Sequence, residues 1–150
     1  MTKAIVVYYS RFGNTEKIAK ALAAGLQSRE VETEIRRVEE VKVDEIGEFN
    51  LMCVGTPTHA WNISKPVKEF VGHLQNLGSG GGKKAFVFDT KFKSRLAGSA
   101  GRKLEKKLKD MGFLIARPAE SAIVLGTEGP LEENAEATFM EIGKDLSSLI

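Results

Sequence analysis

The sequence is poor in cysteine and has no long apolar run. A single cysteine, Cys53, stands among 150 residues, so no disulfide can form within the chain. It lies in an apolar stretch, which predicts a buried, unreactive thiol. No stretch approaches the roughly 20 apolar residues that a membrane crossing needs. An apolar strand is expected almost at the N-terminus, which leaves no room for a signal peptide. We therefore expect a cytoplasmic protein without a membrane partner.

The sequence also lacks a large excess of positive or negative charge. Lys and Arg number 22 and Asp and Glu number 20, which gives a formal net charge of +2. Nucleic-acid binding needs cations concentrated on one face. The densest basic stretch, 91–109, is in part an amphipathic helix whose cations are expected to face solvent. We therefore expect no nucleic-acid partner, and with 42% hydrophobic residues the chain suits one compact domain, 1–150.

Six residues, Ser10-Arg11-Phe12-Gly13-Asn14-Thr15, stand between a predicted strand and a predicted helix. The strand, at about 3–10, is a short run rich in β-branched and aromatic residues, typical of a strand buried on both faces. The helix, at about 14–28, carries apolar residues at the spacing of one helical face. The connection between the two is therefore short, polar and rich in hydroxyl groups.

This connection has the chemistry of a phosphate site. The first backbone N–H groups of a helix are unpaired, and the positive end of the helix dipole lies behind them. The hydroxyls of Ser10 and Thr15 and the amide of Asn14 add further donors, so a phosphate could bind there. The alternative is that Asn14 or Thr15 simply caps the helix, as any α/β turn requires.

Strands and helices continue to alternate along the chain. Further strands are expected near 32–38, 51–55, 85–88 and 122–125, and further helices from about Ser64, around Leu104–Met111 and after Pro130. Five such alternations predict an α/β fold, a doubly wound parallel sheet with helices on both faces. In such a sheet ligands bind at the carboxyl ends of the strands. Polar loops are expected at three of these ends, at 10–15, 56–62 and 89–98, which favours the phosphate interpretation over the cap.

With these three loops the chain resembles the flavodoxins, in particular their short-chain form. Ser10–Thr15 resembles the loop that binds the FMN phosphate, and Gly55–Trp61 is similar to the loop against one face of the isoalloxazine ring. Asp89–Phe92, followed by 97–99, resembles the loop against the other face. The resemblance implies a five-stranded flavodoxin-like sheet in the order 2-1-3-4-5, with FMN as the cofactor.

The resemblance also implies a set of site residues. The phosphate would be bound by Ser10, Arg11, Gly13, Asn14 and Thr15. The ring and ribityl chain would be enclosed by Thr56, Pro57, Thr58, His59, Trp61, Asp89, Thr90, Lys91, Phe92 and Gly98. Either His59 or Trp61 could lie against the ring, because the chain departs from the familiar spacing there. Phe92 could cover the opposite face or merely pack beneath its loop.

The function implied is single-electron transfer between redox partners, a carrier rather than a turnover enzyme. Arg11, Lys91, Lys93 and Arg95 would surround the flavin, whereas familiar flavodoxins are strongly acidic. We expect these cations to make the lower flavin potential less negative and to favour partners with acidic docking surfaces.

Two other functions stay open on the sequence alone. One is an FMN-dependent NAD(P)H or quinone oxidoreductase on the same fold, and the other is a non-redox binding or scaffold domain that has lost its flavin. A signalling receiver domain is set aside, because the first and third strands end at Ser10 and Gly55-Thr56 instead of in acidic metal ligands. The sequence contains no metal-ligand motif and no Ser-His-Asp arrangement.

Overall fold

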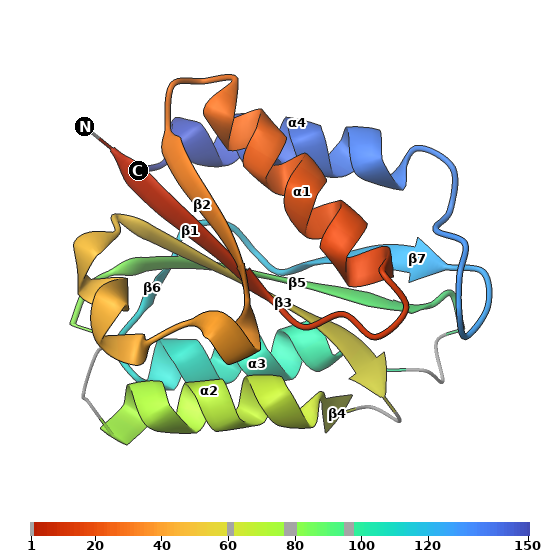
Figure 1. The fold of residues 1–150 in the computed structure, drawn as a ribbon, viewed down its shortest axis with the longest axis horizontal. Helices are drawn as coiled ribbons and strands as arrows, with labels where there is room; N and C mark the ends of the chain where they lie inside the picture. The colour runs from red at the N-terminus through yellow and green to blue at the C-terminus, as the bar shows by residue number, and fades with distance from the viewer. Residues whose placement is uncertain (1, 60–61, 77–80, 95–97) are drawn as a thin grey trace.

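A central β-sheet separates two layers of helices in the computed structural model, which describes residues 2–59, 62–76, 81–94 and 98–150. The strands are β1 (Lys3–Tyr8), β2 (Glu32–Arg37), β3 (Leu51–His59), β4 (Asn62–Ile63), β5 (Lys84–Phe92), β6 (Leu114–Ile115) and β7 (Glu120–Val124). The helices are α1 (Asn14–Gln27), α2 (Lys65–Asn76), α3 (Ala100–Asp110) and α4 (Ala135–Ser147), with two short 3-10 turns, η1 (Val38–Glu40) and η2 (Val43–Glu48). Helices α1 and α4 cover one face of the sheet, and α2 and α3 cover the other (Figure 1).

The order of the strands confirms the predicted fold. The sheet runs β2-β1-β3-β5 with parallel neighbours, and β2 lies at an edge. The fifth place is shared: β6 pairs with the start of β5, and β7 pairs with the residues from Phe88 to Phe92. The fifth strand of the predicted order 2-1-3-4-5 is therefore present in two pieces along β5.

Two of the predicted loops are in part strand. Strand β3 continues to His59, and β5 continues to Phe92. The sequence analysis therefore placed the start of the loops 56–62 and 89–98 too early. The two strands extend together, because Thr56 pairs with Asp89 and Pro57 with Thr90 in the same parallel register. Threonine suits a strand as well as a turn, and the polar composition alone did not separate the two. The last helix also begins later than expected, at Ala135.

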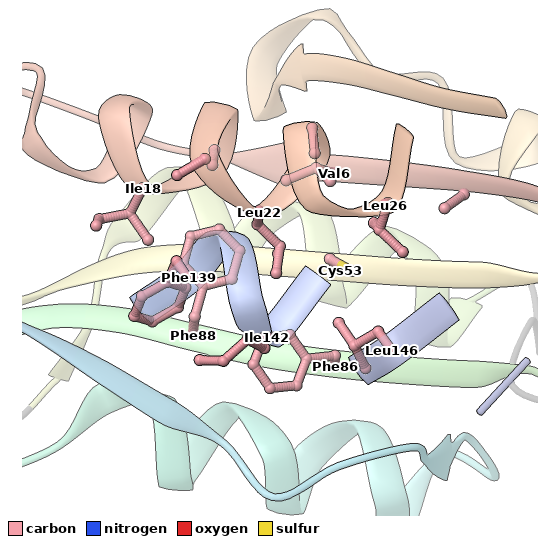
Figure 2. Packing of buried hydrophobic residues seen from close by; sticks show 14 of the residues in the cluster. Val6, Ile18, Leu22, Leu26, Cys53, Phe86, Phe88, Phe139, Ile142 and Leu146 are labelled. Carbon is pink, nitrogen blue, oxygen red and sulfur yellow. The ribbon is translucent and has the colours of Figure 1, made fainter. Parts of the chain in front are cut away.

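The core lies on both faces of the sheet, as two separate clusters of buried side chains. Figure 2 shows the α1/α4 side, where Leu22 and Leu26 of α1 and Ile142 of α4 meet the sheet. The Phe88 and Phe139 rings pack edge to face there, with centroids 5.8 Å apart. Cys53 is fully buried in this cluster, and burial raises the pKa of its thiol, so the predicted inert cysteine is confirmed.

Helices α1 and α4 approach each other at a pair of glycines. A Cβ atom on Gly25 would lie 2.0 Å from the Met140 carbonyl oxygen, and one on Gly143 would lie 2.3 Å from the Leu22 carbonyl oxygen. No side chain fits in either place, so the two backbones touch only because both residues lack a Cβ. Among the described residues, no helix is long and apolar enough to span a membrane.

This contact predicts a stability difference between two glycine substitutions. We expect Gly25→Ala to lower the free energy of unfolding by about 1–3 kcal/mol, because the helices must move apart. Gly72→Ala is the matched control, since Gly72 lies in α2 and its Cβ would meet nothing within 4 Å. We expect the control to be neutral or to gain up to about 1 kcal/mol. Urea unfolding of both variants gives the comparison, and equal stability of the two would contradict the contact.

Candidate functional site

A hollow opens where β1, β3, β5 and β7 end, at the carboxyl edge of the sheet. Its residues come from the segment after β1, from the last residues of β3 and β5, and from β7 and the chain beyond it. They are Ser10, Arg11, Phe12, Asn14, Thr15, Pro57, Thr58, His59, Thr90, Lys91, Phe92, Val124 and Thr127. Strand ends that are distant in the sequence meet here because the strands are parallel.

The segment after β1 leaves the start of α1 open. Gly13 is the residue before the helix and has a left-handed backbone, with φ of 94°. Its N–H donates to the Ser10 hydroxyl oxygen at 3.0 Å. No side chain among the described residues caps α1, so the alternative of a cap by Asn14 or Thr15, which the sequence analysis ranked second, does not hold. The first N–H groups of the helix therefore stay available to an anion.

The side chains of Asn14 and Thr15 are bound elsewhere. The Asn14 amide donates to the Glu128 carbonyl oxygen at 3.2 Å, which ties the start of α1 to the chain beyond β7. The Thr15 hydroxyl lies 2.9 Å from the Thr90 hydroxyl, and both side chains are buried. This pair joins α1 to β5 directly below the hollow.

Arg37, which the sequence did not indicate, braces the same segment from the end of β2. Its guanidinium donates to the Ser10 carbonyl oxygen at 3.1 Å and lies over the Tyr8 ring, 5.6 Å from the centroid. It also lies 3.7 Å from the Glu16 carboxylate, which sits in the first turn of α1. Lys20 bonds Glu16 as well, and this bond is the main reason that the pKa of Glu16 is lowered. The two cations thus offset the acidic side chain nearest the open helix start.

The rim of the hollow carries aromatic rings and cations. Phe12 and Phe92 are both more than two-fifths exposed, which is unusual for rings of this size. The Arg11 guanidinium lies over the Phe12 ring, 5.1 Å from its centroid. Lys91 lines the hollow and Lys93 is exposed just beyond β5. Trp61, one of the two candidates for stacking on the ring, and the predicted cation Arg95 lie outside the described residues.

Four of the predicted site residues that the structure describes do not line the hollow: Gly13, Thr56, Asp89 and Gly98. Thr56 is fully buried, and its hydroxyl accepts from the Ser64 N–H at 3.1 Å. Asp89 is fully buried and accepts from the Gly101 N–H at 3.0 Å. Gly98 has φ of 71° and precedes α3. Thr56 and Asp89 thus link the ends of β3 and β5 to the residue before α2 and to the start of α3.

The sequence analysis did not predict the lining residues at the end of β7, Val124 and Thr127. The segment Gly126-Thr127-Glu128-Gly129-Pro130 has the composition of a turn and follows the last strand. Because ligands bind at the carboxyl ends of parallel strands, this segment was a candidate as well. Phe12 was also left out, although it stands within the phosphate segment. Among the described residues, no group of three metal-ligating side chains is present.

The comparison with known families identifies the family of the chain. The family model described as flavodoxin matches residues 6–142, nearly the whole chain. The chain belongs to the flavodoxin family. FMN is the cofactor of that family, and the residues present fit it. The open helix start suits a phosphate, and a Cβ on Gly13 would meet nothing within 4 Å, so the approach is free.

Solved flavodoxin structures match the chain over its full length. A flavodoxin from the domain Archaea is 26% identical with a TM-score of 0.84, covering 98% of this chain and 97% of that one. Flavodoxin 2 from Bacillus cereus has a TM-score of 0.86, covering 99% and 100%. It is 18% identical, so its likeness shows the fold alone.

Curated relatives match a shorter part of the chain. An NAD(P)H dehydrogenase (quinone) 3 from Rhizobium meliloti is 29% identical over 97 residues, which covers 51% of this chain and 46% of the relative. An NAD(P)H dehydrogenase (quinone) from Paracoccus denitrificans is 28% identical over 97 residues and is covered to 47%. The chain therefore spans about half the length of the curated relatives that it matches.

Proposed function

We propose that this chain carries single electrons between redox partners on FMN held without a covalent bond in the hollow. The observation that carries the proposal is the open start of α1, which shares one hollow with hydroxyls, cations and exposed rings at the ends of β1, β3 and β5. FMN supplies the electron-accepting ring when bound. The chain's own residues bind it, orient it and control access to its edge.

In this proposal, the segment after β1 binds the phosphate end of the cofactor. Gly13 allows the turn, the first N–H groups of α1 donate to the phosphate, and Ser10 and Arg11 add a hydroxyl and a positive charge. Asn14 and Thr15 contribute through their backbone, because their side chains bond Glu128 and Thr90. Arg37 holds this segment in place through the Ser10 carbonyl.

The ends of β3 and β5 enclose the ring and ribityl chain in this proposal. Their lining residues there are Pro57, Thr58, His59, Thr90, Lys91 and Phe92, with Thr56, Asp89 and Gly98 behind them. One ring face would be covered by His59 or Trp61 and the other by Phe92. Phe12 and Phe92 are exposed at the rim, which keeps a ring edge within reach of a partner.

Cations around the hollow favour a partner with an acidic surface. Arg11, Lys91 and Lys93 surround the rim, and Arg102 and Lys103 are exposed at the start of α3. Such a surface speeds association with an acidic partner at low ionic strength. We propose that an acidic redox protein docks over this rim.

An oxidoreductase acting on NAD(P)H and a quinone is the second candidate. The names of the curated relatives favour it, and the rim cations could bind a nucleotide phosphate. The carrier is preferred because the flavodoxins match this chain over almost all of both lengths.

Turnover assays separate the two candidates. We expect the purified chain to take up FMN and, with NADH or NADPH and a benzoquinone, to consume the nucleotide only at the rate of free FMN. Reductive titration should show bound FMN accepting two electrons in separate steps. Sustained, saturable nucleotide oxidation would favour the oxidoreductase, and failure to bind FMN would contradict both candidates.

The phosphate assignment predicts a selective loss of affinity. We expect Ser10→Ala to weaken FMN binding by about 10-fold, the cost of one lost hydrogen bond to a charged group. Riboflavin, which lacks the phosphate, should bind both proteins equally. Ser28→Ala is the matched control, because the Ser28 hydroxyl bonds the Gly25 carbonyl at the far end of α1. Fluorescence titration measures all of these affinities, and an equal loss for FMN and riboflavin would contradict the assignment.

The docking proposal predicts a salt-dependent rate. We expect Lys93→Glu to slow electron transfer to an acidic ferredoxin several-fold in low salt, with the difference shrinking as salt rises. Arg29→Glu makes the same change of charge at the far end of α1 from the hollow and should transfer electrons as the unmodified protein does. Stopped-flow absorbance gives the rates. Equal effects of the two reversals would rule out docking at the rim.

A further inference from the structure

Asp89 is a fully buried carboxylate in β5, and its two oxygens are used very unequally. Oδ2 accepts three hydrogen bonds: from the Thr58 hydroxyl at 2.8 Å, the Ser99 hydroxyl at 3.0 Å and the Gly101 N–H at 3.0 Å. Oδ1 is buried and has no partner among the described residues. The three donors come from the end of β3 and the start of α3, so one oxygen joins three elements.

The fold makes room for this carboxylate. Burying a charge costs several kcal/mol unless hydrogen bonds and dipoles offset it. The start of α3 supplies both, because its positive end faces a carboxylate that accepts one of its N–H groups. A Cβ on Gly101 would lie only 3.2 Å from Asp89 Cγ, so the glycine at this position leaves the space the carboxylate fills.

Thr58 connects Asp89 to the hollow. Its hydroxyl donates to Asp89 Oδ2 and accepts from the Ala100 N–H at 3.0 Å, so its orientation is fixed from both sides. The same side chain lines the hollow, as does Thr90, the residue next to Asp89 in β5. The carboxylate therefore lies directly behind the wall that faces the ring part of the site.

We propose that Asp89 is a positioning residue for the flavin. It fixes Thr58 and the start of α3 along one wall of the hollow, and it places its carboxylate behind that wall. This inference rests on the proposed binding of FMN in the hollow.

A negative charge at Asp89 and the positive charges at the rim shift the reduction potentials of bound FMN in opposite directions. Lys93 is exposed, so its effect on a bound flavin is screened by salt, whereas a buried charge is screened much less. A negative charge behind the wall makes electron uptake at the ring less favourable. Removing it raises the reduction potentials of bound FMN, and the rise persists at high salt.

Asp89→Asn tests the charge, because it keeps the shape of the side chain and one acceptor oxygen. Asp110→Asn is the matched control, since it removes the same charge from an exposed position at the other end of α3. Potentiometry of the FMN-loaded proteins in low and in high salt should show a positive shift for Asp89→Asn several times that of the control in both. A shift no larger than that of the control, with FMN bound, would overturn the role of the charge.

Thr58→Val tests the positioning separately, because it keeps the charge and removes the hydroxyl. We expect about a 10-fold loss of FMN affinity, with a smaller change in potential than Asp89→Asn gives. Hydrogen exchange of the apoprotein gives a readout that needs no flavin. The Ala100 and Gly101 amides should exchange faster in Thr58→Val and Asp89→Asn than in the unmodified chain.

The outcomes keep this inference apart from the proposed function. Unchanged exchange at Ala100 and Gly101 would overturn the positioning role whether or not FMN binds. Faster exchange in a chain that takes up no FMN would support the network and contradict the proposed function instead. If Asp89→Asn does not fold, Ser99→Ala, which removes another donor to Oδ2, tests the same exchange and affinity.

Discussion

The whole site depends on backbone N–H groups at the start of α1 that no side chain of the described residues caps. Four such groups are left over at any helix start, and most proteins satisfy them with a cap. Here Gly13 takes the place of a capping residue, and the Ser10 hydroxyl bonds the Gly13 N–H, one step before the helix. The helix therefore presents its positive end to the hollow, and the side chains of Asn14 and Thr15 bond Glu128 and Thr90 instead of capping it.

Buried polar contacts behind the hollow keep its walls in place. The Thr15–Thr90 hydroxyl pair joins α1 to β5, the Thr56 hydroxyl joins β3 to the residue before α2, and Asp89 joins β3 and β5 to α3. Each pairs polar atoms that would otherwise be costly to bury. The ends of parallel strands would be free to splay without such contacts. The hollow thus has an uncapped helix start on one side and walls that buried hydrogen bonds support from behind.

The electrostatic pattern around the hollow has two layers. In the proposed function, the exposed cations at the rim attract a partner from a distance, and salt weakens this attraction. The buried Asp89 carboxyl lies behind one wall of the hollow, where salt screens a charge much less. Glu16, the acid in the first turn of α1, is offset by Arg37 and Lys20, so it does not repel an anion at the helix start. Attraction of partners and tuning of the bound group can therefore be set by different residues.

The sequence by itself determined the alternation of strands and helices and the burial of Cys53, because each depends on consecutive residues or on a local period. The prediction of a phosphate segment at Ser10–Thr15 depends on consecutive residues in the same way. Only the tertiary structure decided that β3 and β5 extend to His59 and Phe92, since that depends on their mutual register. The same holds for Arg37 over Tyr8, for the burial of Asp89, and for Val124 and Thr127 in the lining. These contacts join residues far apart along the chain, and no local pattern records which strand ends will meet.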